Sequence, residues 1–389
     1  MKDHRRDFLK KALLASAGVA TAPLIGAAHR STEQQSGMHP SLENTGKTAA
    51  KKVLKNWVWI NPDQNKSTAE LDTTYGAYAK AGITGVFFEN DSEKHFRSAK
   101  RQGLEAHRWM WTMNRGEKDL LQAHPDWYAV SRTGKSCATQ PPYVDYYRWL
   151  CPSKATTLEY LQKQVSSILA LDYVDGIHLD YVRYCDVILP VNLWSNYNLV
   201  QTTELPDYDF CYCEHCQKSF TKWCGETLSD ITYPEASLSW RQFRYNQVTN
   251  IVNHLAEIAH GTNKKITAAV FPTPEVARRN VRQDWTYWNM DGVCPMIYHG
   301  FYKENTRWIG DAVAEGVHFL HGKMPLYAGL YLPDFKSSGD LKEGIRYALD
   351  NGAGVSLFSE RCQMGTWLVC RKLQGSFWPN KNKKQNISK

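Results

Sequence analysis

Residues 175–184 read Asp-Gly-Ile-His-Leu-Asp-Tyr-Val-Arg-Tyr, and this stretch indicates the fold. Apolar side chains alternate with His178 and Asp180, as in a buried strand whose two faces have different surroundings. The apolar face would lie under a helix, and His178 and Asp180 would point toward the axis of a barrel. A buried carboxylate is costly unless it has a partner or a function. The stretch therefore predicts either an ion pair of Asp180 with Arg183 or, as we favour, a catalytic Asp180 at the mouth of a (β/α)₈ barrel.

Strand-like and helix-like segments alternate along the chain, which is typical of an α/β fold with a parallel sheet. Eight segments have the composition of strands: 57–60, 85–90, 106–112, 175–184, 266–271, 292–298, 325–331 and 354–359. Helices are expected at 68–81, 93–102, 156–171 and 238–259. Residues 186–210 contain Pro, Asn and Asp without periodicity. The predicted fold is thus a (β/α)₈ TIM barrel with a long excursion after strand 4.

The first 28 residues have the order of an export signal. The run Arg5-Arg6-Asp7-Phe8-Leu9-Lys10 precedes an apolar stretch rich in Ala and Gly, and small residues follow at 26–28. This resembles a twin-arginine signal peptide, which implies the twin-arginine export machinery as a partner and a periplasmic or extracellular location. No later apolar run is long enough to span a bilayer. Downstream we expect a linker over 29–50, a catalytic barrel over 51–378 and a disordered basic tail over 379–389.

The charge balance argues against a nucleic-acid partner. The formal net charge is +8, but the first 30 residues hold six basic against two acidic residues, and the last nine hold four lysines. The folded core is therefore close to neutral, whereas nucleic-acid binding calls for a clustered basic surface. The 14 Trp and 21 Tyr instead supply flat faces that stack on sugar rings, although packing accounts for most of them.

Several stretches together resemble the glycoside hydrolases described as family-10-like, a group of barrel enzymes. The matching stretches are His124-Pro125-Asp126-Trp127, Trp149-Leu150-Cys151-Pro152-Ser153, the 175–184 strand, Phe210-Cys211-Tyr212-Cys213-Glu214-His215-Cys216, Gln283-Asp284-Trp285-Thr286-Tyr287-Trp288 and Cys294-Pro295-Met296-Ile297-Tyr298. They follow one another from the third strand to the sixth. The resemblance implies a barrel that hydrolyses glycosidic bonds, although fold alone does not give function.

The Cys211-x-Cys213-x-x-Cys216 motif places three thiols close together. Three thiolates at this spacing suit three corners of a tetrahedral zinc site. The motif also resembles the zinc loop of family 42 β-galactosidases, where a fourth Cys comes from earlier in the chain; here Cys185 or Cys151 would supply it, and His215 is a substitute. Disulfide bonds are the alternative in an exported protein. We expect a structural zinc ion and no cofactor for catalysis.

Hydrolysis of a glycoside normally uses two carboxyl groups that flank the scissile bond. Asp180 is the first, as nucleophile or base. For the acid, Glu275 follows the fifth strand, and a fourth-strand Asp with a fifth-strand Glu is a pairing that several retaining barrel families use. Glu360, at the end of the eighth strand, is the reserve. Glu275 follows a loop that contains prolines, which could carry it away from the mouth.

Residues near other strand ends are candidates for contact with the sugar. We expect this role for Trp57, Trp59, Glu89, Trp111, His178, Arg183 and Tyr298. For His178, a hydrogen-bonded place in the barrel interior is the simpler interpretation. The leading hypothesis is an exported glycosidase with a carbohydrate substrate. The alternatives are a carbohydrate-binding barrel without catalysis, and a polysaccharide lyase or esterase that uses His178, Tyr298 and Arg183.

Overall fold

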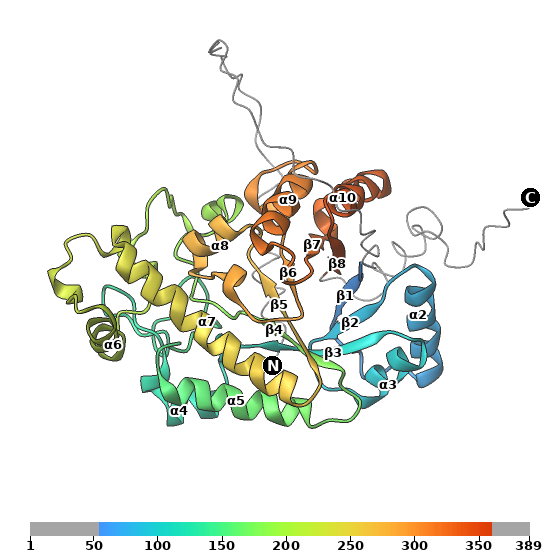
Figure 1. The fold of residues 1–389 in the computed structure, drawn as a ribbon, viewed down its shortest axis with the longest axis horizontal. Coiled ribbons are helices and arrows are strands. Elements are labelled where there is room, and N and C mark those ends of the chain that lie inside the picture. Colours follow the sequence, from blue (N-terminus) through green and yellow to red (C-terminus); the bar gives the residue numbers. More distant parts are fainter. Residues whose placement is uncertain (1–53, 360–389) are drawn as a thin grey trace, which may run out of the picture.

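Eight parallel strands form the centre of the structure, a computed structural model that describes residues 54–359 (Figure 1). They are β1 (Trp57–Ile60), β2 (Gly85–Phe88), β3 (Glu105–Trp111), β4 (Gly176–Asp180), β5 (Lys265–Val270), β6 (Gly292–Pro295), β7 (Tyr327–Tyr331) and β8 (Gly354–Phe358). Consecutive strands pair from β1 to β6, β7 pairs with β8, and β8 pairs with β1. Single bridges from Val293 to Leu326 and from Met296 to Gly329 join β6 to β7. The predicted (β/α)₈ barrel is confirmed.

Helices follow most of the strands and cover the outside of the barrel (Figure 1). They are α2 (Thr68–Lys80), α3 (Glu93–Arg101), α4 (Lys118–Ala123), α5 (Ala155–Leu169), α6 (Glu214–Cys224), α7 (Leu238–Gly261), α8 (Pro274–Val281), α9 (Trp308–Leu320) and α10 (Ser338–Asp350). Helix α2 begins at a capping box. The Glu70 amide donates to Ser67 Oγ, and the Ser67 amide donates to the Glu70 carboxylate. The four expected helices are present.

The outward-facing strand residues are apolar and lie buried under these helices. Val58, Val86, Ile177 and Leu179 are fully buried members of this outer core. Burial of each such side chain stabilises the fold by about 1.5–3 kcal/mol. The alternation read from residues 175–184 therefore gives the correct orientation of this strand.

The barrel interior is filled by aromatic side chains, which stack from one end toward the other. The Trp57 and Phe87 rings are parallel, with centroids 4.5 Å apart, and Phe87 stacks on His178 at 3.7 Å. The Cβ of any larger residue at Gly85 would lie 2.2 Å from the Trp57 ring, so the strand needs a glycine there. Barrel interiors are usually dominated by Val, Ile and Leu. Here the rings form a solid base beneath the C-terminal mouth.

The excursion after β4 is longer than expected and contains short helical turns. It runs through the 3₁₀ turns η2 (Val191–Tyr197) and η3 (Pro206–Tyr208), then α6, η4 (Leu228–Asp230) and η5 (Pro234–Ala236), before α7 begins. Two hydrogen bonds tie it to the loop after β3: the Tyr212 amide donates to the Val130 carbonyl, and the Arg132 amide to the Asp209 carbonyl. In Figure 1, α6 lies at the outer edge of the molecule, away from the strands.

The expected signal, linker and basic tail lie outside residues 54–359. The same holds for Glu360, the reserve acid. Among the described residues, no helix is both long enough and apolar enough to cross a membrane.

Candidate active site and cysteine cluster

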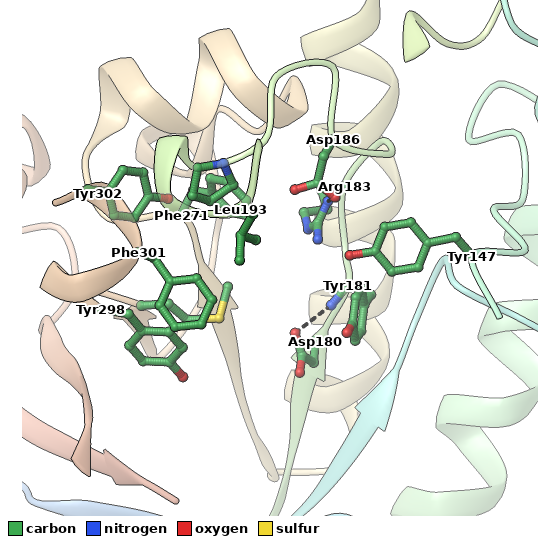
Figure 2. Close-up of a pocket in the computed structure, with 12 residues that line it drawn as sticks. Tyr147, Asp180, Tyr181, Arg183, Asp186, Leu193, Phe271, Tyr298, Phe301 and Tyr302 are labelled. Carbon is green, nitrogen blue, oxygen red and sulfur yellow. Dashed lines mark hydrogen bonds and ion pairs between the residues drawn. The ribbon is translucent and has the colours of Figure 1, made fainter. Parts of the chain in front are cut away.

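A pocket opens at the C-terminal mouth of the barrel (Figure 2). Its lining comes from the loop after β3, the end of β4, the excursion, the residue after β5, the segment after β6 and the 3₁₀ turn η7 (His299–Tyr302). Asp180, Arg183 and Asp186 are its charged members, and most of the others are aromatic. In Figure 2 the charged side chains and Tyr147 lie on one side, and Tyr298, Phe301 and Tyr302 lie on the other. A mostly apolar pocket with a few convergent polar groups is the usual form of a ligand site.

Asp180 is the last residue of β4 and lies at the base of this pocket. The indole Nε1 of Trp109 donates to Oδ2 at 3.0 Å, and the amide of Tyr181 donates to Oδ1 at 2.8 Å. Tyr181 has a φ of 51°, in the left-handed region, which is uncommon for a residue with a side chain. The chain therefore turns sharply after Asp180, and both carboxylate oxygens are held in fixed directions.

Arg183 forms an ion pair with Asp186, three residues further along. Its Nη1 lies 3.0 Å from Asp186 Oδ2 and also donates to the carbonyl of Tyr184. Burial, the largest single effect, would lower the pKa of Arg183, but the charge of Asp186 together with smaller contributions from Tyr147, Tyr181 and Cys185 outweighs it and raises the pKa. The guanidinium also lies over the rings of Trp149, at 4.7 Å, and Phe271, at 4.9 Å. The sequence offered an ion pair between Asp180 and Arg183 as an alternative. In the structure, Arg183 pairs with Asp186 instead.

Asp186 gives the pocket a second carboxylate that sequence reasoning missed. Its side chain and that of Arg183 are 3% and 6% exposed, so each charge is compensated mainly by the other. The only sign of Asp186 in the sequence was its spacing, three positions after Arg183. Without the fold, nothing distinguished it from the other acids of the excursion.

His178 and Trp59 lie in the barrel interior beneath the pocket. Trp59 Nε1 donates to His178 Nε2 at 2.9 Å, and His178 Nδ1 lies 2.9 Å from Thr267 Oγ1. With Nε2 accepting, Nδ1 of a neutral imidazole carries the proton and donates to Thr267. His178 therefore has the interior place that the sequence favoured. Neither it nor Trp59 is among the residues that line the pocket.

Trp57 lies at the opposite end of the barrel. It lines a separate pocket together with Lys55, His107 and Tyr327. The first strand enters from this end, so its first residue is furthest from the mouth. The expectation that Trp57 contacts a ligand in the Asp180 pocket is wrong.

Trp111, Glu89 and Tyr298 lie nearer the mouth. Trp111 packs on Tyr181, with ring centroids 4.8 Å apart, and so supports the pocket from behind. Glu89 follows β2, is half-buried and is not among the lining residues. Tyr298 does line the pocket and packs against Tyr331 at 5.4 Å.

Glu275 is exposed in the first turn of α8 and is not among the residues that line the pocket. The helix begins at Pro274, and the Thr273 hydroxyl caps it by accepting from the Val276 amide. Proline is favoured in the first turn of a helix. The helix therefore starts soon after β5, and the structure does not bring Glu275 together with Asp180.

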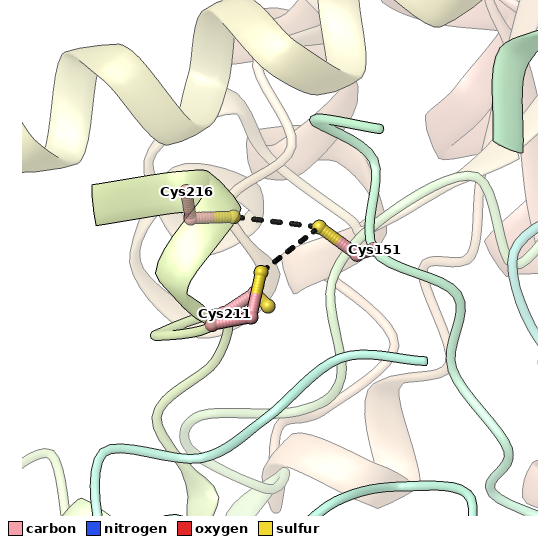
Figure 3. Close-up of side chains that lie close together, drawn as sticks. Cys151, Cys211 and Cys216 are labelled. Carbon is pink, nitrogen blue, oxygen red and sulfur yellow. Dashed lines mark hydrogen bonds between the residues drawn. The ribbon is translucent and has the colours of Figure 1, made fainter. Parts of the chain in front are cut away.

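Four cysteines form a cluster beside the excursion (Figure 3). The sulfur atoms of Cys151, Cys211, Cys213 and Cys216 all lie within 4.8 Å of one another. Four sulfurs around one zinc ion at about 2.3 Å would be about 3.8 Å apart in a regular tetrahedron. Cys151 Sγ lies 3.4 Å from that of Cys216 and 3.8 Å from that of Cys213. The donor set and its spacing fit a zinc ion.

The cysteines that the structure describes are free thiols. A disulfide would join only two of the four sulfurs, whereas one ion would use them all. The pKa of Cys151 is raised, mainly by its hydrogen bond with Cys211. The pKa of Cys213 is lowered, mainly by its hydrogen bond with Cys151. The Val130 amide also donates to Cys211 Sγ at 3.3 Å.

Cys151 completes the cluster, so the assignment of Cys185 as fourth ligand is wrong. Cys185 is fully buried, and burial is the largest of the effects that raise the pKa of its thiol. His215, the suggested substitute, lies 2.8 Å from the Ser153 carbonyl through its Nε2. Cys151 comes from the loop after β3. A bound ion would therefore join that loop to the excursion.

A buried ion cluster lies between the excursion and the outer helices. Asp209 pairs with Arg244 of α7 and with Arg282, which follows α8, and Glu204 also pairs with Arg282. Burial, the largest single effect, would raise the pKa of Asp209, but the charges of Arg244 and Arg282 together with hydrogen bonds from Tyr212 and Arg244 outweigh it and lower the pKa. Tyr212, one residue after Cys211, donates its hydroxyl to Asp209 at 2.5 Å. The cluster and the cysteines thus fix the same part of the excursion.

No protein-family model matches this sequence, and no curated protein sequence matches it either. Solved structures do match. The glycoside hydrolase domain of PgaB (BpsB) from Bordetella bronchiseptica has a TM-score of 0.61 and 12% identity, over 83% of this chain and 99% of that domain. The β-galactosidase of the psychrophilic Marinomonas ef1 has a TM-score of 0.57 and 12% identity, over 79% of this chain and 54% of its own.

The β-galactosidase of Bacillus circulans sp. alkalophilus has a TM-score of 0.55 and 12% identity, over 82% of this chain and 55% of its own. This chain thus spans about half the length of the two β-galactosidases. At such low identity, these similarities establish the barrel fold and leave the activity to the site itself.

Proposed function

We propose that this chain is an exported glycoside hydrolase that cleaves an oligo- or polysaccharide in the Asp180 pocket. The observation that carries the proposal is the position of Asp180, at the end of a barrel strand and at the base of an aromatic-lined pocket. Active sites of TIM barrels lie at this end. The solved barrels of similar fold include a glycoside hydrolase domain and β-galactosidases, which supports the same class of reaction.

In this proposal Asp180 attacks the anomeric carbon, or stabilises positive charge that develops there. Its two oxygens accept from Trp109 and from the Tyr181 amide, which would hold the carboxylate in place during the reaction. Asp186 is our candidate for the second carboxyl group, in preference to the exposed Glu275. Because its pair with Arg183 keeps it ionised, it would act as the base that takes a proton from the attacking water; the resulting hydroxyl group replaces the leaving group, and the departing oxygen takes up a proton from solvent.

Tyr147, Tyr181, Tyr298, Phe301 and Tyr302 are the proposed contacts to the sugar. They line the pocket on both sides of the two carboxylates. Flat apolar rings with polar edges suit the apolar faces and hydroxyl groups of a pyranose. Arg183 would act mainly by holding Asp186 in place, because its charge is already compensated in that ion pair.

The test is release of reducing ends from a panel of glycans by the purified full chain. Asp180→Asn should lower turnover by on the order of 10³, as loss of a main catalytic group does. Asp172→Asn is the matched control, because Asp172 is exposed before the same strand and pairs with Arg97. Retention of most of the rate by Asp180→Asn would overturn the assignment. Products that absorb in the ultraviolet would indicate a lyase, and glycan binding without turnover a binding barrel.

We also propose that Cys151, Cys211, Cys213 and Cys216 hold a structural zinc ion. Four protein ligands leave no position for substrate, so this ion would take no part in the reaction. The resemblance of the motif to the zinc loop of family 42 β-galactosidases supports the same assignment. Export through the twin-arginine route would be compatible with it, because such proteins cross the membrane folded, with the metal already bound.

A further inference from the structure

Gln283 is completely buried, and it is the first residue of the stretch 283–288, which follows α8. Helix α8 ends at Val281, and Arg282 then turns the chain with a φ of 55°, in the left-handed region. The backbone amide of Gln283 donates to the Ala277 carbonyl at 3.1 Å. The end of α8 thus holds Gln283 in place, and its side chain reaches the ends of β4 and β5.

The side-chain amide of Gln283 joins these two strands where their direct pairing has ended. The pairing of β4 with β5 runs to Leu179 and Ala268. Three residues further along each strand direction, the Phe271 amide donates to Gln283 Oε1 at 2.8 Å, and Gln283 Nε2 donates to the Val182 carbonyl at 3.2 Å. A glutamine amide is both acceptor and donor, so it can take the place of a direct hydrogen bond between strands. Gln283 therefore sets the separation of the two strand ends at the mouth of the barrel.

The backbone that Gln283 holds carries two residues of the Asp180 pocket. Arg183 directly follows Val182, and its guanidinium lies 4.9 Å from the centre of the Phe271 ring. Both Arg183 and Phe271 line the pocket (Figure 2), whereas Gln283 is not among the lining residues. Arg183 in turn forms the ion pair with Asp186. The spacing set by Gln283 thus fixes the contact of Arg183 with Phe271 and, through Arg183, the direction of the Asp186 carboxylate.

Two backbone hydrogen bonds hold the same part of the excursion against the end of α8. The Tyr184 amide donates to the Val281 carbonyl at 3.1 Å, and the Val187 amide donates to the Asn280 carbonyl at 2.8 Å. These bonds do not involve β5, and they remain when a side chain is replaced. A substitution of Gln283 should therefore change the spacing of β4 and β5 while residues 184–187 stay attached to α8.

We propose that Gln283 is a positioning residue, which spaces the ends of β4 and β5 and thereby holds Arg183 and Asp186 in the geometry that the reaction requires. Its effect on turnover rests on the proposed function, whereas its effect on the position of Arg183 does not. An apolar side chain of similar size would leave the Val182 carbonyl and the Phe271 amide without their partner. The two strand ends should then move until these groups find other partners.

The test compares Gln283→Met with Asn56→Leu and needs no substrate. Asn56 is also buried and also joins two backbone segments, because it donates to the Gly82 carbonyl at 3.1 Å and accepts from the Val355 amide at 3.2 Å. It precedes β1, at the opposite end of the barrel. Each variant loses two buried hydrogen bonds, so both should have a lower Tm than the wild type.

Only Gln283→Met should shift the NMR signal of the Arg183 guanidinium, because that signal depends on the ring of Phe271 and on the ion pair. The signal is identified by its absence from the spectrum of Arg183→Lys. An unchanged Arg183 signal in Gln283→Met would refute the proposal. An equal shift in Asn56→Leu would also refute it, because the effect would then be one of general destabilisation.

Gln283→Glu provides a second variant if Gln283→Met does not fold. A neutral carboxyl group can still accept from Phe271 and donate to Val182, whereas an ionised carboxylate has no donor and would repel the Val182 carbonyl. Burial favours the neutral form. The Arg183 signal of this variant should therefore match the wild type at pH 5 and depart from it by pH 9. Agreement with the wild type throughout this range would refute the proposal.

Once a substrate is identified, the steady-state constants provide a further readout. Gln283→Met should lower kcat by about 10- to 100-fold, as small displacements of catalytic groups do, with a smaller change in KM, because Asp186 acts in the reaction. Asn56→Leu should keep both constants. An unchanged kcat in Gln283→Met would refute the role in turnover. Absence of hydrolysis by the wild type would refute the proposed function, whereas the Arg183 signal would still decide whether Gln283 positions Arg183.

Discussion

Replacement of Cys151 by Ser tests the metal site at the position that the sequence left open. Cys151 is fully buried, and three other sulfurs lie within 4.8 Å of its own. A serine hydroxyl stays protonated at neutral pH and is a poor substitute for a soft thiolate ligand of zinc. The purified wild-type protein should contain about one zinc ion per chain, and Cys151→Ser should contain little.

The size of the effect follows from linkage. An ion that binds only the folded state at 1,000 times its Kd stabilises that state by about 4 kcal/mol. For a domain of this size, each kcal/mol shifts Tm by roughly 2–4 °C. Removal of zinc from the wild type with a chelator should therefore lower Tm by roughly 8–16 °C.

Cys185→Ser is the matched control, because Cys185 is equally buried but lies outside the cluster. Both variants place a hydroxyl where a buried thiol was, so both should have a lower Tm than the wild type. Only Cys185→Ser should keep its zinc and its response to the chelator, by metal analysis and thermal unfolding. Loss of zinc from Cys185→Ser but not from Cys151→Ser would refute the assignment. Wild-type protein without zinc, with these cysteines in disulfides, would refute the site altogether.

Two further predictions concern stability and export. Asp209→Asn leaves the buried charges of Arg244 and Arg282 poorly compensated. Urea unfolding should therefore show that the free energy of unfolding falls by about 3–5 kcal/mol. An unchanged free energy of unfolding would contradict this prediction. Since the pKa of Asp209 is lowered on folding, its stabilisation is present above its unfolded pKa of about 3.9 and is lost as the pH falls through the folded value. The wild type should then lose stability on acidification more steeply than the variant. Arg5→Lys with Arg6→Lys should retain the precursor in the cytoplasm, and undiminished export in cell fractions would refute the signal.

Local patterns in the sequence were sufficient to predict the barrel and the position of Asp180 at the end of β4. The strands are short, and their inward and outward residues alternate, so the orientation of Asp180 depends only on its own strand. The same holds for Cys211, Cys213 and Cys216, which lie within one short motif. Such features need no knowledge of which segments become neighbours.

The partners of these residues depend on the closed barrel and its loops. Cys151 lies 62 residues before Cys213 in the sequence, and it meets the motif only because the loop after β3 and the excursion after β4 pack together. Glu275 follows β5 as expected, yet α8 begins at Pro274 and leaves its side chain exposed.

Contacts between residues at the mouth of the barrel also depend on the tertiary structure. Arg183 is satisfied by Asp186 because the chain turns back after Tyr181, and Gly300 meets Asp334 because β6 and β7 are neighbours in the barrel. The sequence by itself determined which segments are strands and which strand end carries the carboxylate, since both are properties of short stretches of chain. Only the tertiary structure decided which charges, sulfurs and rings meet, because those contacts join residues that the barrel brings together from distant positions.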